Sequence, residues 1–81
     1  MIVTIAEIQN LVQMQLGLRK VSAEDRFMED LGAESVDLLN IIAAVEDKYH
    51  ISFDEAEIPG IRTVRQLYEL TELTIRTGLH N

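Results

Sequence analysis

Apolar residues at helical spacing, bounded by helix start and stop signals, constrain the fold of this chain more than any other feature. In the first such stretch, a Thr4–Glu7 capping box precedes apolar residues that recur every three or four positions as far as Gly17, a common helix stop. No alternation typical of a β-strand persists for long. This stretch therefore predicts a helix over about 5–16.

The middle of the chain has the broadest apolar pattern. A second helix is expected to start at Ser35 and to run to about Tyr49, and it is apolar over more than one core-facing stripe. Such a helix is either largely buried or presents an apolar patch to a partner. Its apolar positions are Val36, Leu38, Leu39, Ile41, Ile42, Ala43, Ala44 and Val45.

A third helix is predicted near the C-terminus. Thr63 and Gln66 form another capping box, and Gly78 is the matching stop signal. The apolar residues between these signals follow the helical period, so we expect this helix over about 64–76.

Two irregular segments connect the helices. Residues 17–34 show no sustained period and make a long connection for a compact domain. Residues 50–62 should form at most a single helical turn, because Pro59 and Gly60 are expected to end anything helical there. The fold class expected is all-α: one domain over 1–81, a small four-helix bundle of three main helices plus one short helix, with a long loop between the first two helices.

The charge of the chain is concentrated in its middle. The net charge of −7 is the balance of two parts: residues 24–57 hold eleven acids and two bases, whereas the rest holds three acids and five bases. The acidic middle would repel nucleic acid and an acidic membrane surface, and it would attract a basic protein surface. The sequence therefore predicts basic protein partners and no nucleic-acid partner.

Location follows from what the chain lacks. The longest apolar run, IIAAV, is far too short to span a membrane, so no membrane insertion is expected. The N-terminus has no basic stretch followed by a long apolar one, as a secretion signal would. The absence of cysteine fits a reducing compartment. We expect a cytoplasmic protein.

Few residue patterns support catalysis or metal binding. The carboxylates indicate solvated helix faces rather than an acid–base pair. His50 is expected at the end of the second helix and His80 in the C-terminal tail, both without a catalytic role. There is no calcium-binding loop pattern, phosphate-binding loop or metal-ligand spacing. No catalytic residue and no metal ligand are predicted.

Ser35 permits two interpretations. By local pattern it is an ordinary helix N-cap, and Asp37 in the first turn fits that view. Alternatively it is a modification site. A serine hydroxyl is a weak nucleophile without a base, so another enzyme would have to act on it. A helix N-terminus also accommodates an attached phosphate well.

The stretch LGAESVD around Ser35, with FMED just before it, resembles a signature of the acyl carrier protein family. Its signature is an aspartate–serine–leucine triplet preceded by leucine and glycine, which LGAESVD matches in part at Leu31, Gly32 and Ser35. The similarity covers nearly the whole chain. Further matches are Phe27, Glu29, Asp30, Ala33, Asp37, Glu46, Asp47, Ile61, Thr63 and Val64.

The resemblance implies a bundle of acyl-carrier type that works as a carrier and not as an enzyme. It implies that a phosphopantetheinyl transferase attaches 4′-phosphopantetheine from coenzyme A covalently to Ser35, whose arm then holds acyl groups as thioesters. Partners would be acyl-transferring, ketosynthase or ligase enzymes with basic patches, and the carrier would be a monomer. Docking residues would be Glu34, Val36, Asp37, Glu46 and Asp47. Candidates to line an acyl pocket, or else plain core, are Leu39, Ile42, Val45, Phe53, Ile61 and Leu67.

Departures from the family pattern suggest a specialised carrier with its own partners in fatty-acid, polyketide or another acyl pathway. Glu34 replaces the aspartate before the serine, Val36 replaces leucine or methionine, and Asn40 stands where many fatty-acid carriers have glutamate. The start methionine favours a freestanding unit. Alternatives are an aminoacyl or peptidyl carrier, an unmodified acidic helical adaptor and, more remotely, a calcium binder.

Overall fold

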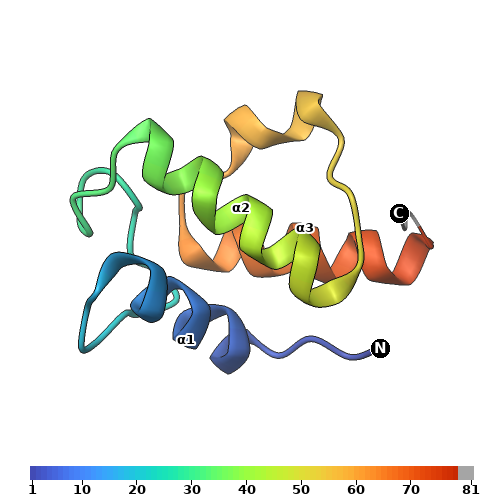
Figure 1. Cartoon of the computed structure of the whole chain (residues 1–81), viewed down its shortest axis with the longest axis horizontal. Helices are drawn as coiled ribbons and strands as arrows, with labels where there is room; N and C mark the ends of the chain where they lie inside the picture. The colour runs from blue at the N-terminus through green and yellow to red at the C-terminus, as the bar shows by residue number, and fades with distance from the viewer. Residues whose placement is uncertain (79–81) are drawn as a thin grey trace.

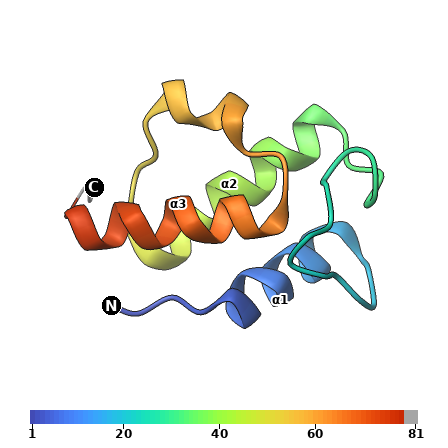
Figure 2. The same ribbon diagram turned by 180° about the vertical axis from the view of Figure 1, so that it is seen from behind.

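Three α-helices and one short 3-10 helix make up the fold of the described part of the chain. A computed structural model describes residues 1–78, with α1 at Ile5–Leu16, α2 at Ser35–Tyr49, the 3-10 helix η1 at Glu55–Gly60 and α3 at Val64–Thr77. Figures 1 and 2 show α1 on one side of the molecule and η1 on the other, with α2 and α3 crossing between them, and α1 packs against both α2 and α3. The all-α class with three main helices and one short helix is confirmed.

The helix boundaries follow local capping signals. Thr4 and Glu7 form the predicted capping box of α1, in which the Glu7 N–H donates to Thr4 Oγ1 at 3.2 Å and the Thr4 N–H donates to Glu7 Oε1 at 3.0 Å. Thr63 begins α3 in the same way. Gly17 ends α1 in the left-handed conformation, at φ 68°, which favours glycine. The helices α1 and α3 therefore lie where the sequence predicts them, and α3 ends one residue later than predicted.

The short helix η1 ends at Gly60, as the Pro59–Gly60 signal predicts, but it is longer than the single turn expected. Pro59 lies inside it. Proline breaks an α-helix because its ring clashes with the preceding turn and because it lacks an N–H donor. The six residues of η1 make about two 3-10 turns, and so short a helix tolerates proline because few of its backbone bonds are needed. Here Asp54 begins the turn by accepting a bond from the Ala56 N–H at 3.0 Å.

The long loop between α1 and α2 is fastened to the start of α3. The Phe27 N–H donates to the Arg62 carbonyl at 3.0 Å, and the Val64 N–H donates to the Asp25 carbonyl at 3.1 Å. An isolated antiparallel bridge pairs Arg26 with Thr63 at the same place. These bonds satisfy backbone groups that a loop this long would otherwise expose. They also fix Phe27, which is 1% exposed, in the core.

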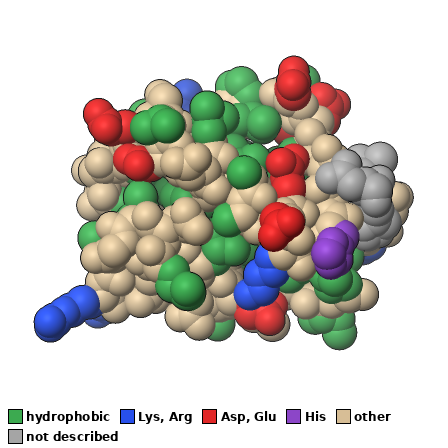
Figure 3. Space-filling view, in the orientation of Figure 1, with side chains coloured by type: hydrophobic (Ala, Val, Ile, Leu, Met, Phe, Trp, Pro, Cys, Tyr) green, Lys and Arg blue, Asp and Glu red, His purple; other side chains and the backbone are tan. Residues whose placement is uncertain are grey.

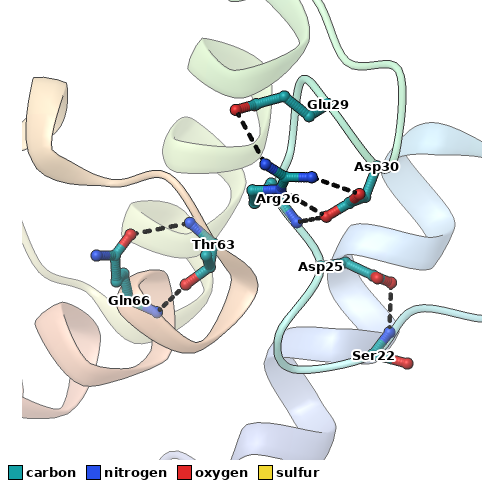
Figure 4. Close-up of polar contacts among 7 residues, drawn as sticks. All are labelled: Ser22, Asp25, Arg26, Glu29, Asp30, Thr63 and Gln66. Atoms are coloured by element: carbon teal, nitrogen blue, oxygen red, sulfur yellow. Dashed lines mark hydrogen bonds and ion pairs between the residues drawn. The ribbon is translucent and has the colours of Figure 1, made fainter.

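A charged turn in the same loop is visible in Figure 4. The Arg26 side chain bonds both carboxylate oxygens of Asp30, at 3.0 and 3.2 Å, and lies 3.8 Å from Glu29. The hydrogen bond from Arg26 lowers the pKa of Asp30. Because all three side chains are exposed, the pairs contribute little free energy, and they serve to hold the turn before α2 in shape.

The core lies where the three α-helices and the long loop meet. Tyr49 joins α2 to α1 at its edge, since its hydroxyl donates to Glu7 Oε1 at 3.2 Å. Burial of the ring, with the nearby Glu7 charge and this hydrogen bond, raises the pKa of Tyr49 to about 12. The buried apolar residues are Val3, Ile8, Val12, Val21, Phe27, Ala33, Ile41, Ile42, Val45, Tyr49, Ile51, Phe53, Ile61, Val64 and Leu67.

We expect Tyr49 to make the fold less stable between about pH 10 and pH 12. Its hydroxyl ionises near pH 10 in the unfolded chain and at about 12 in the folded one, so the stabilisation is complete below pH 10 and is lost as the pH rises through this window. Urea unfolding across the window should show a falling midpoint for the native chain and a smaller fall for Tyr49→Phe. Equal falls in both proteins would contradict the assignment.

Candidate functional site

Ser35 is the first residue of α2 but not its cap. The N-cap is Glu34, in extended conformation, and its N–H donates to Asp37 Oδ2 at 2.8 Å. The interpretation of Ser35 as an ordinary N-cap is therefore wrong, because the carboxylate three residues after the cap satisfies the cap's own amide. Ser35 is exposed, and within residues 1–78 its hydroxyl makes no hydrogen bond. The hydroxyl is free to react.

The histidine at the end of α2, His50, is far from Ser35. His50 caps the opposite end of this helix, in the left-handed conformation at φ 55°. At 1.5 Å per residue the two residues are roughly 20 Å apart. His50 therefore cannot take the Ser35 proton, and His80 lies outside the described residues. Within residues 1–78, therefore, no histidine is placed to activate Ser35.

The turn that leads into Ser35 depends on one glycine. Gly32 has φ 68°, a left-handed conformation that other residues adopt only with strain. Immediately after it, the Ala33 N–H donates to the Phe27 carbonyl at 2.8 Å, and Ala33 is buried at 7% exposure. The turn thus reverses the chain over the core and delivers Ser35 to the surface.

A groove of about 660 Å³ begins at Ser35 and is hereafter called the Ser35 groove. Its volume lies within the range of small-molecule sites, and apolar side chains dominate its walls. Its walls come from α2 (Ser35, Leu38, Leu39), from the long loop (Phe27, Met28, Glu29) and from η1 and the segment after it (Ile58, Pro59, Ile61, Arg62).

Two of the six pocket candidates, Leu39 and Ile61, line the Ser35 groove. The remaining four are not among the residues that line it, which agrees with the alternative that they are plain core. They are buried in the core at 6% exposure or less: Ile42, Val45, Phe53 and Leu67. Sequence reasoning missed the wall supplied by η1, because no local signal indicates how a short 3-10 helix packs.

The five predicted docking residues have different surroundings. Glu34, Val36 and Asp47 are exposed, and Val36 presents 57% of its surface to solvent. Asp37 and Glu46 are half-buried, and each accepts a backbone hydrogen bond: Asp37 caps α2, while Glu46 Oε2 accepts from the Phe53 N–H at 2.9 Å. These two carboxylates therefore have structural contacts besides any partner contact.

The surface over α2 and η1 carries both acidic and apolar side chains. Figure 3 shows acidic side chains at several places on this face, with hydrophobic side chains exposed among them. Around Ser35 the exposed apolar residues are Met28, Val36 and Leu39. An apolar patch with an acidic rim suits a partner with a basic rim around an apolar contact.

Two further kinds of site can be checked in the described part of the chain. Over residues 1–78 no group of three or more acidic or histidine side chains is placed to hold a metal ion, so nothing there favours the calcium-binding alternative. None of the helices in the same range has the length and apolar character needed to cross a membrane.

Most of the chain is similar to known proteins. Residues 6–71 match a family model described as a phosphopantetheine attachment site. A relative named "Acyl carrier protein" from Trieres chinensis is 37% identical over 71 residues, which cover 85% of this chain and 89% of that protein. Ser35 lies within both the matched range and the exposed start of α2.

Solved structures share the fold. The oxytetracycline acyl carrier protein in solution superposes with a TM-score of 0.79 at 23% identity, over 96% of this chain and 87% of that one. A chain of the structure called "The ishigamide ketosynthase/chain length factor" gives a TM-score of 0.70 at 23% identity, over 86% and 90%. At these identities the likeness concerns the fold alone.

Proposed function

The chain belongs to the acyl carrier protein family, and we propose that it carries acyl groups as thioesters on a 4′-phosphopantetheine arm attached to Ser35. The observation that carries the proposal is the exposed Ser35 hydroxyl, which makes no hydrogen bond to residues 1–78 and lies at the start of α2 beside the Ser35 groove. Coenzyme A would supply the arm, and a phosphopantetheinyl transferase would supply the base, since no histidine of residues 1–78 lies near Ser35.

The surroundings of Ser35 fit a phosphodiester. The N–H groups of Ser35 and Val36 open α2 and have no acceptor within the helix. These N–H groups and the positive end of the helix dipole stabilise an attached phosphate. The Asp37 carboxylate is engaged by the Glu34 N–H, so it does not occupy the amides that would face the phosphate.

Carriers of this family deliver substrates and are not themselves catalysts, and partner enzymes carry out the chemistry on the arm. We propose acyl-transferring, ketosynthase or ligase partners with basic patches. Val36 would give the apolar contact beside the arm, and Glu34 and Asp47 would give charged contacts. Contacts of this kind speed encounter and release quickly, as a shuttle requires.

Intact mass spectrometry tests the proposal. The native chain is incubated with coenzyme A and a broad-specificity phosphopantetheinyl transferase, and fragmentation locates any added group. We expect a gain of one phosphopantetheine, found on the peptide that contains Ser35. A folded chain that gains nothing with several transferases would overturn the carrier function and favour an unmodified acidic adaptor.

A further inference from the structure

The Ser35 groove has a charge pattern that its apolar walls do not explain. Two charged residues line it, Glu29 from the long loop and Arg62 from the segment between η1 and α3. Both side chains belong to exposed residues, so each keeps its charge at the mouth of an apolar groove.

These two charges differ in their partners. Glu29 lies 3.8 Å from the Arg26 guanidinium, as Figure 4 shows. Arg62 forms no ion pair with any residue in 1–78, whereas Arg65 and Arg76 are paired with Glu24 and Glu72. Arg62 is therefore the one charge at the groove without an ion-pair partner in residues 1–78, whereas Glu29 shares the single Arg26 guanidinium with Asp30.

We propose that the Ser35 groove selects acyl groups that carry a carboxylate at their far end, and that Arg62 pairs with this carboxylate. This inference rests on the proposed function, because the acyl group reaches the groove on the arm at Ser35. Arg62 is a specificity-determining residue in this assignment and takes no part in making or breaking the thioester.

The groove suits both parts of such an acyl group. The side chains of Leu38, Leu39, Ile58 and Ile61 can cover a methylene chain, for which burial is favourable. A guanidinium matches a carboxylate with two parallel hydrogen bonds, better than any other side chain does. An acyl group with an amine at its far end would meet Arg62 with a like charge, so Arg62 disfavours a terminal amine there.

The backbone of Arg62 is held independently of its side chain. Its N–H donates to Gln66 Oε1 at 2.8 Å, and its carbonyl accepts from the Phe27 N–H at 3.0 Å. Substitutions of the exposed side chain leave both bonds in place, so Arg62→Gln and Arg62→Lys should fold as the native chain does.

Thioester lifetime tests the inference. A broad-specificity transferase loads the chain from adipoyl-coenzyme A or from hexanoyl-coenzyme A, which differ by the terminal carboxylate. Hydroxylamine then cleaves the thioester to a hydroxamate and a free thiol, and mass spectrometry follows the rate of cleavage.

We expect Arg62→Gln to speed adipoyl cleavage about two- to fivefold, the effect of an exposed ion pair, and to leave hexanoyl cleavage unchanged. Arg62→Lys should retain most of the protection, and Arg19→Gln, which removes an exposed arginine elsewhere, should match the native chain.

Other outcomes separate the explanations. Equal acceleration of both thioesters by Arg62→Gln would assign Arg62 to the phosphodiester of the arm and would overturn the selection of carboxylates. If Arg62→Gln changes the cleavage rate of neither thioester, Arg62 is an ordinary solvated arginine, and the selection of carboxylates is overturned as well. If the native chain accepts no acyl arm at all, the proposed function fails first, and this inference falls with it.

Discussion

Replacement of Ser35 by alanine is expected to abolish phosphopantetheine loading completely and to leave the stability of the fold almost unchanged. Loading needs the Oγ atom, and no other serine lies at the start of a helix in residues 1–78. Stability does not need it, because Glu34 is the N-cap of α2 and the Ser35 hydroxyl makes no hydrogen bond in that range. Alanine is also the best helix former, so the free energy of unfolding should change by less than about 0.5 kcal/mol.

Loading and urea unfolding of Ser35→Ala together distinguish the attachment role of Ser35 from a capping role. Loss of a serine N-cap costs about 1 kcal/mol, which would lower the midpoint of urea unfolding. A variant that unfolds earlier but still gains the arm would assign Ser35 a structural role. The matched control is Ser52→Ala, at an exposed serine outside the helices, which should load and unfold as the native chain does.

Much of the fold could be predicted because its signals are local. A threonine followed three residues later by glutamate or glutamine satisfies the first amides of a helix whatever surrounds it, and this placed α1 and α3. Gly17 and Gly78 adopt the left-handed conformation that their positions indicated. Capping depends on a few neighbouring residues, so one sequence suffices to recognise it.

The start of α2 shows where local signals compete. Serine is a better N-cap by general preference than glutamate, which favoured Ser35 as the cap. The structure places the cap one residue earlier, since the Asp37 carboxylate reaches the Glu34 N–H. The helix begins at Ser35 as predicted, but the serine side chain is released from capping.

The Ser35 groove depends on long-range packing and could be predicted only in part. Leu39 and Ile61 were named among the pocket candidates that the family resemblance implies, and both line the groove. Ile58 and Pro59 were missed because their role depends on how η1 lies over α2, which no periodicity encodes. Arg62 was missed because an isolated arginine has no signal until the groove beside it is known.

Reversal of one charge on α2 should slow recognition by the transferase about five- to tenfold at low salt. Asp47 is exposed near the end of α2, and its replacement by lysine puts a positive charge into the surface that we propose meets basic partners. Lysine near the C-terminal end of a helix is favourable for the dipole, so Asp47→Lys should remain folded. The measurement is kcat/KM for loading at low salt and at about 0.5 M salt, where screening should shrink the difference towards the native value.

The control must alter the net charge equally but on another face. Glu69 is exposed on α3, and Glu69→Lys changes the net charge by the same two units as Asp47→Lys does. If recognition depends on the overall field of an acidic protein, both variants should slow loading alike. If the α2 surface is the docking surface, only Asp47→Lys should do so, because the rate of a steered encounter is sensitive to charges at the contact. Equal slowing would leave Ser35 as the site of the arm but would remove the α2 surface as the place where partners bind.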